Sequence, residues 1–225
     1  MPFTDDSGSM DGRKGEVLLE ALGFLARRLR SCDRLSIIAF NHHAKVVTGL
    51  RRMDLAGKES VAGAISSSWA LRPAGGTDIV AGVQLACAVL GRRRQSNAIT
   101  SLLLFTDGQD DDAYVLCGGS GEASSRPSPP HARPASGRPD VQAGTLRDIL
   151  PPRIALHCFG LGDDCDTKLL GALAETVPHS TFTFIEAAAH VPAAFGCCLG
   201  MCVYHPPRCL LQPARLTLKP LNPKP

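Results

Sequence analysis

The sequence predicts a doubly wound α/β fold, a mostly parallel central sheet with helices on both faces and one antiparallel edge strand. Short, continuously apolar runs alternate with longer segments whose apolar residues recur at helical spacing, an alternation typical of parallel sheets covered by helices. Two early apolar runs are joined only by Asn41-His42-His43, which favours a hairpin and so an antiparallel edge. With 225 residues, 44% of them hydrophobic, the chain can form one domain with a full core.

Four segments carry apolar residues at the spacing of one helical face. The first follows the polar residues Gly12-Arg13-Lys14, so we expect a helix directly after a polar turn at residues 5–10. The third follows Thr77-Asp78 in the same way. The four apolar faces are Leu18, Leu22, Leu25 and Leu29; a shorter one within residues 55–65; Ile79, Val83, Ala86 and Leu90; and Leu169, Leu170, Leu173 and Val177.

The apolar runs between these helices are the predicted strands. His42 and His43, between the second and third runs, are interpreted as turn residues rather than ligands. The short run at the start is interpreted as the remnant of a central strand, because it has four residues where about five or six are typical. In chain order the runs are 1–4, 34–40, 44–48, 98–105, 154–159 and 181–185.

Two stretches depart from this alternation. Residues 117–152 are rich in Gly, Ser, Pro, Arg and Ala, which indicates a disordered, low-complexity insert in which only residues 146–150 look helical. Residues 204–225 contain many prolines, which exclude regular structure. We therefore predict a domain over residues 1–203, interrupted by the insert and followed by an irregular tail.

Charge and cysteine content narrow the functional classes. Lys and Arg exceed Asp and Glu by 24 − 21 = 3, too little to indicate nucleic acid, and the arginine runs on predicted helices are interpreted as solvated faces. No stretch reaches the roughly 18 apolar residues that a membrane span needs, and no signal-peptide pattern is present. Nine cysteines without framework spacing favour reduced thiols, so we expect a cytoplasmic, monomeric protein.

A zinc cluster near the C-terminus is a weaker alternative. Its candidate ligands lack paired C-x-x-C knuckles, and the spacing of Cys197, Cys198 and Cys202 fits a helix and its end. The candidates are Cys197, Cys198, Cys202, His205 and Cys209.

Oxygen-bearing side chains gather at three points of the predicted fold. Asp5, Ser7 and Ser9 alternate in a glycine-containing turn after the first strand, Thr77 follows two glycines before the third helix, and Asp107 ends an apolar strand. Open parallel sheets bind ligands outside the carboxyl ends of their strands, where these segments would meet. Carboxylate and hydroxyl oxygens suit a hard cation such as Mg²⁺, which prefers about six oxygen ligands.

The succession D-x-S-x-S, G-G-T-D and apolar run–T-D-G resembles the metal-ion-dependent adhesion site of von Willebrand factor A (vWA) domains, over residues 1–117 and 153–203. The resemblance implies a Rossmann-like vWA fold and a protein-binding module rather than an enzyme. It implies direct ligation of Mg²⁺, or of Mn²⁺ or Ca²⁺, by Ser7, Ser9 and Thr77, with Asp5 and Asp107 binding directly or through water. An Asp or Glu carboxylate of a partner protein would fill the open position.

Further segments resemble the vWA domains of plant RING-type ubiquitin ligases of the wavy-growth group. They are 33–37, 50–53, 105–110 and 157–162. The RING part is absent from this sequence, so the resemblance does not extend to ligase activity. Asp6 stands where the family usually has an uncharged residue and is expected to add negative charge beside the cation. The run 110–112 is interpreted as a solvated acidic loop rather than a second ion site.

Two alternatives to the binding module stay open. One is a Mg²⁺-dependent phosphatase with Asp5 as nucleophile. Such enzymes resemble D-x-D, in which the second carboxylate serves as acid and base. Ser7 stands at that second position, and a hydroxyl cannot shuttle a proton at neutral pH. The other is a vWA fragment that neither folds stably nor binds metal, which the short first strand suggests. A comparison of melting with and without Mg²⁺ separates the fragment from the binding module.

Overall fold

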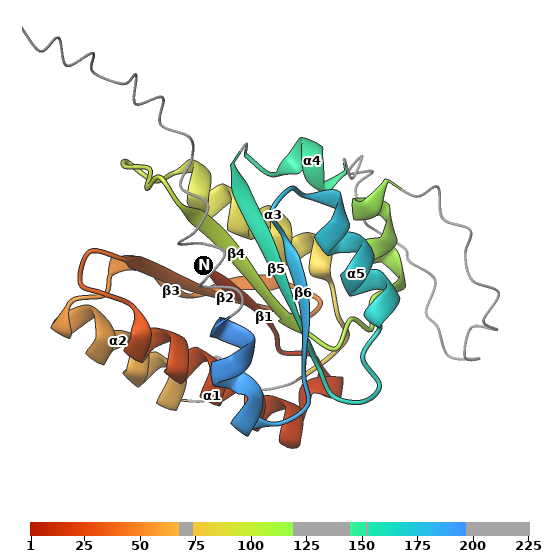
Figure 1. The fold of residues 1–225 in the computed structure, drawn as a ribbon, viewed down its shortest axis with the longest axis horizontal. Helices are drawn as coiled ribbons and strands as arrows, with labels where there is room; N and C mark the ends of the chain where they lie inside the picture. Colours follow the sequence, from red (N-terminus) through yellow and green to blue (C-terminus); the bar gives the residue numbers. More distant parts are fainter. Residues whose placement is uncertain (68–73, 119–144, 152, 197–225) are drawn as a thin grey trace, which may run out of the picture.

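The computed structural model of the chain describes residues 1–67, 74–118, 145–151 and 153–196. A six-stranded sheet with the order β3-β2-β1-β4-β5-β6 forms its centre. Helices α1 and α2 cover one face, and helices α3, α4 and α5 lie on the other (Figure 1). The predicted layers are therefore confirmed.

The strands and helices have the following bounds. The strands are β1 (Pro2–Asp5), β2 (Arg34–Phe40), β3 (Ala44–Arg52), β4 (Thr100–Thr106), β5 (Ile154–Leu161) and β6 (Thr181–Ile185). The α-helices are α1 (Arg13–Arg28), α2 (Leu55–Ser66), α3 (Ile79–Gly91), α4 (Leu146–Ile149) and α5 (Thr167–Thr176). Short 3-10 turns occur at η1 (Gly8–Met10), η3 (Asp111–Cys117) and η4 (Ala188–His190).

Strand pairing follows the prediction. All neighbouring strands run parallel except β2 and β3, which form the antiparallel hairpin at one edge. Strand β3 continues to Arg52, four residues beyond the predicted end at Thr48. The register shifts between the partners of Leu35 and Ile38, where β3 contains more residues than the facing stretch of β2. Such irregularities are common at sheet edges, where the extra residue increases the local twist.

The short first strand lies at the centre of the sheet. All four residues of β1 are buried, and Phe3 pairs with Ile38 of β2 on one side and Leu104 of β4 on the other. Pro2 begins the strand, a position where its missing N–H does not interrupt the ladder. Strand β1 is short, as the sequence indicated, and it pairs with a neighbouring strand on both sides, as a central strand does.

Alternation along the central strands divides the core in two. Leu103 and Phe105 of β4 face the layer of α1 and α2, where Phe105 stacks on Phe159 with ring centroids 4.8 Å apart. Leu102 and Leu104 face the layer of α3 and α5. Because successive side chains of a strand point to opposite faces, one apolar run supplies both cores.

The predicted domain limits lie mostly beyond the reach of the structure. Of the predicted insert over 117–152, residues 119–144 and 152 are outside the described ranges, as are the tail over 204–225 and the Cys and His residues considered for zinc. The predicted helical piece is present as α4, where Thr145 and Asp148 form a capping box. No helix in the described ranges is both long and apolar enough to cross a membrane.

Candidate metal site

The candidate site lies where the chain order of the sheet reverses direction. Strand β1 leads to β2 on one side, while β4 pairs on its other side, so the loops after β1 and β4 diverge at their carboxyl ends. The loop before α3 is joined to the loop after β1 through backbone hydrogen bonds. Gly8 N–H donates to Gly75 O at 2.9 Å, and Ala74 N–H donates to Asp6 O at 2.7 Å. Three segments far apart in sequence therefore meet at one edge of the sheet.

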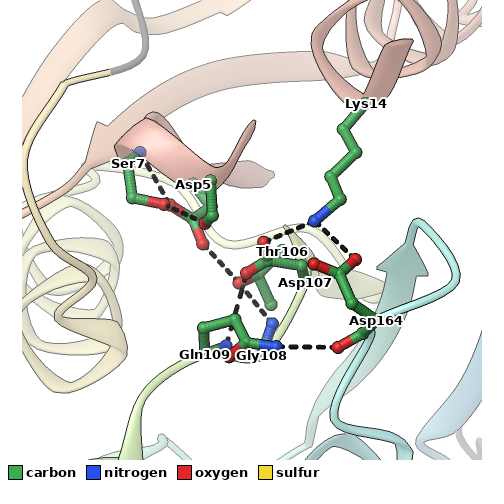
Figure 2. Close-up of polar contacts among 9 residues, drawn as sticks. Asp5, Ser7, Lys14, Thr106, Asp107, Gly108, Gln109 and Asp164 are labelled. Atoms are coloured by element: carbon green, nitrogen blue, oxygen red, sulfur yellow. Dashed lines mark hydrogen bonds and ion pairs between the residues drawn. The ribbon is translucent and has the colours of Figure 1, made fainter. Parts of the chain in front are cut away.

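Asp5 is one of two fully buried predicted ligands, together with Asp107. The Asp5 side chain is 0% exposed. Its Oδ1 accepts a hydrogen bond from Ser7 N–H at 2.8 Å, and its Oδ2 accepts one from the Thr106 hydroxyl at 2.5 Å (Figure 2). Thr106 in turn accepts from Gly108 N–H at 2.9 Å. Ser7 of the D-x-S-x-S motif and Thr106 of the T-D-G motif thus hold this carboxylate in one orientation.

Enclosure changes the acidity of Asp5. Burial, and to a smaller extent the negative charge of Asp107, raises its pKa to about 6 against the lowering effect of the hydrogen bonds from Ser7 and Thr106. Burial penalises the charged form, as expected for a carboxyl group in a medium of low dielectric constant. A cation at this point would favour the ionised form.

The hydroxyls of Ser7 and Ser9 lie beside this carboxylate. Their Oγ atoms are 3.0 Å apart, with Ser7 buried and Ser9 exposed to solvent. In the described ranges, no three His, Cys, Asp or Glu side chains gather closely enough to hold a metal ion. A cation at this edge would therefore need hydroxyl oxygens as well as carboxylates, a donor set that suits a hard ion.

Asp107 lies at the carboxyl end of β4 and forms an ion pair with Lys14. The Lys14 Nζ is 2.9 Å from Asp107 Oδ2 and 2.6 Å from Asp164 Oδ1, so the ammonium group lies between two carboxylates (Figure 2). Burial alone would lower the pKa of Lys14, but its hydrogen bonds to Asp164 and Asp107 raise the pKa above its usual value. Sequence reasoning treated Lys14 only as part of a polar helix start and missed this contact.

Thr77 reaches the site less directly. It is half-buried, and among the described residues no hydrogen bond joins its side chain to the other four predicted ligands. Gly75 adopts φ +80°, and a methyl group there would lie 2.7 Å from the ring of His42, so glycine permits both the turn and the contact. Asp78 begins α3, its Oδ1 accepting from Ala81 N–H at 2.9 Å.

Two acidic neighbours of the site have partners that the sequence did not indicate, and the prediction of a solvated side chain was wrong at Asp110. Asp6 forms an ion pair, in which Lys45 Nζ lies 2.8 Å from its Oδ2. Burial raises the pKa of Asp6, while the contact with Lys45 lowers it. Asp110 is buried rather than solvated, and its Oδ2 accepts a hydrogen bond from Ile79 N–H at 2.7 Å at the start of α3. It satisfies one of the free N–H groups of that helix.

Comparisons with known proteins agree with this architecture. Residues 4–109 match the family model of the von Willebrand factor type A domain. An uncharacterized protein of Synechocystis sp. is 35% identical over 182 residues, which are 81% of this chain and 36% of that protein. The E3 ubiquitin-protein ligase WAVH1 of Arabidopsis thaliana is 34% identical over 114 residues, 47% of this chain and 17% of the ligase. The chain thus spans well under half the length of either relative.

Solved structures share the fold. A von Willebrand factor type A protein from Catenulispora acidiphila superposes with a TM-score of 0.63 at 21% identity, over 86% of this chain and 40% of that one. The proximal thread matrix protein 1 of the mussel byssus, solved with a zinc-occupied MIDAS motif, superposes with a TM-score of 0.58 at 15% identity, over 88% of this chain and 44% of that one. The family model over residues 4–109 and the sheet order agree, and together they identify a von Willebrand factor type A domain within this chain.

Proposed function

We propose that the chain is a metal-dependent protein-binding module whose site is formed by Asp5, Ser7, Ser9, Thr77 and Asp107. The observation that carries the proposal is the meeting of three distant segments at the carboxyl ends of β1 and β4. There the paired hydroxyls of Ser7 and Ser9 lie next to a carboxylate that is oriented by its own hydrogen bonds. The zinc-occupied motif of the mussel byssus protein, which has the same fold, supports this proposal.

The residues fit a divalent cation by their chemistry. Serine and threonine hydroxyls supply neutral oxygens, and the two aspartates supply the negative charge that a cation needs to leave water. Mg²⁺ is the expected ion, with Mn²⁺ and Ca²⁺ as alternatives, since all three accept hard oxygen ligands. When bound, such an ion supplies an electrophilic position for one more oxygen, and an Asp or Glu carboxylate of a partner protein would fill it.

The likeness to ubiquitin ligases supports a shared domain rather than a shared reaction. The matched segment is 17% of WAVH1, so most of that ligase has no counterpart in the match. We therefore propose binding, not ligase chemistry, as the activity of the described domain.

Metal titration tests the site. Mg²⁺ or Mn²⁺ should bind once per chain in calorimetry, and a hundredfold excess over Kd should stabilise the fold by about 2.7 kcal/mol in thermal melts. Asp107→Ala and Ser9→Ala should each lose most of this increment. Ser9 is exposed, so its variant should fold as the wild type does. Glu59→Ala, which removes a negative charge from the exposed surface of α2, is the matched control and should bind metal normally.

Partner binding needs a second assay. Proteins retained by the immobilised wild type should be released by EDTA and should not be retained by Ser9→Ala. Wild-type protein that binds no divalent ion in calorimetry would overturn the proposal. So would partners that are retained equally with and without the chelator.

A further inference from the structure

Lys14 is anchored between a buried and an exposed carboxylate. Its side chain is 15% exposed, while Asp107 is 0% and Asp164 61% exposed. The buried contact, Nζ to Asp107 Oδ2 at 2.9 Å, is made to one of the proposed metal ligands. Lys14 is therefore a neighbour of the site, whereas most basic side chains of α1 are solvated.

The loop after β5 is shaped around the lysine side chain. Gly162 adopts φ +87°, and a side chain at this position would overlap Cε of Lys14. Glycine is the residue that allows both this backbone conformation and the close approach. Asp164, two residues later, forms an ion pair with the ammonium group of Lys14 on the solvent side. Lys14 thus has a defined path and two anchors, a stronger arrangement than a surface lysine paired with one acid.

The charge of the site follows from these contacts. Asp5, Asp107 and Asp164 contribute three negative charges when ionised, and Lys14 contributes one positive charge beside them. A divalent cation would bring the group to a net charge of −1 without the lysine, but to zero with it. Opposite charges a few ångströms apart attract several times more strongly near a protein surface than in water, so one unit of charge is enough to alter binding.

We propose that Lys14 sets the charge of the metal site, weakening the binding of the cation and strengthening the capture of a carboxylate by the metal-loaded protein. The inference rests on the proposed function and adds its electrostatic control. Lys14 acts here as a positioning and charge-setting residue, because its contact is with Asp107.

A simpler role for Lys14 leads to a different result. If the ammonium group only competed with the ion for Asp107, its removal would raise metal affinity and leave the affinity for a carboxylate unchanged. If the lysine only supported the fold, its removal would lower both affinities. The proposed role alone moves the two affinities in opposite directions.

The experiment compares three variants of the full chain. Lys14→Met removes the charge and keeps the length of the side chain, and Lys14→Arg restores the charge. Arg13→Met removes the same charge from the exposed neighbouring position on α1. Mn²⁺ affinity is measured from the electron paramagnetic resonance of the free ion. Carboxylate affinity of the Mn²⁺-loaded protein is measured from the broadening of ¹³C-labelled acetate.

In Lys14→Met, Mn²⁺ affinity should rise about tenfold and acetate affinity should fall about tenfold, each the ratio that roughly 1.4 kcal/mol produces. Arg13→Met should change neither affinity by more than about twofold, because a solvated charge is screened. Lys14→Arg should restore both values toward the wild type. Lower affinity for both ligands, an unchanged acetate affinity, or no change in either would each overturn the inference. Wild-type protein without Mn²⁺ binding would instead overturn the proposed function beneath it.

Discussion

His42 Nε2 accepts a hydrogen bond from the backbone N–H of Gly76 over a distance of 2.9 Å. The contact joins the turn between β2 and β3 to the loop that carries Thr77, across 34 positions of sequence. The contact also explains why Gly75 and Gly76 are glycines. The imidazole ring lies against their backbone, where any side chain would collide with it. A histidine assigned to a turn from the sequence is thus also a support of the candidate site.

Replacing this histidine should weaken metal binding more than folding. In His42→Ala the loop loses one acceptor, and a net hydrogen-bond contribution of about 0.5–1.5 kcal/mol corresponds to a two- to tenfold loss of Mg²⁺ affinity. The melting temperature without metal should change little, since His42 is exposed. His43→Ala is the matched control, as His43 is also exposed and takes part through its backbone N–H. Equal metal affinities in the two variants would contradict this role of His42.

Asp5 should make the metal-free fold sensitive to pH. Its folded-state pKa of about 6 lies above the ordinary 3.8. The group therefore stabilises the fold fully below pH 3.8 and loses that contribution as the pH rises through 6. In EDTA, the free energy of unfolding of Asp5→Asn minus that of the wild type should grow between pH 4 and 7 by up to about 3 kcal/mol. Urea denaturation at each pH measures the difference, and a gap independent of pH would rule out a raised pKa.

Lys45 should stabilise the fold through Asp6. Asp6 is 1% exposed, and among the described residues its Oδ1 accepts no hydrogen bond, so Lys45 is its charged partner. Lys45→Met should lower the free energy of unfolding by about 1–2 kcal/mol, because it leaves a buried carboxylate unpaired. Adding Asp6→Asn to this variant should restore most of the loss.

A control for this cycle is the exposed pair of Arg30 and Asp33, whose charged atoms lie 3.5 Å apart. Arg30→Met should cost less than about 0.5 kcal/mol, the scale of solvated ion pairs. If Lys45→Met is equally mild, the charge of Asp6 is balanced by something other than this pair.

The phosphatase alternative predicts an activity that we expect to be absent. The side chain of Asp5 is fully buried. Ser7 stands at the position where such phosphatases carry a second carboxylate, so Asp5 lacks the acid/base partner that attack on a phosphate ester requires. Purified protein with Mg²⁺ should hydrolyse p-nitrophenyl phosphate no faster than the metal blank. Saturable turnover that disappears in Asp5→Asn would establish the enzyme instead of the binding module.

Much of the fold could be predicted because local patterns report burial. The leucines of α1 recur at the helical period, and the strand predicted at 181–185 coincides with β6. The gathering of Asp5 and Asp107 also followed from the rule that parallel strands end at a common edge.

The supporting contacts of the site could not be predicted in the same way. Lys14 is 93 positions from Asp107, and Thr106 is 101 positions from Asp5. Their pairing depends on the register of strands and on the angle of α1, which no local pattern encodes. The burial of Asp110 could not be predicted for a related reason. A run of acidic residues usually indicates solvent exposure, and the sequence does not show that the start of α3 lies close enough to accept this side chain as a hydrogen-bond partner.

The place of β1 has a consequence for protein synthesis. Phe3 is made about a hundred residues before its partner Leu104 in β4. At a translation rate of about 5–20 residues per second, one edge of β1 waits roughly 5–20 s for its neighbour. During that interval only the hairpin of β2 and β3 can pair with it. The nascent chain therefore exposes the edge of β1 that will later pair with β4, together with the apolar side chain of Phe3. Such a transient surface is of the kind that chaperones bind.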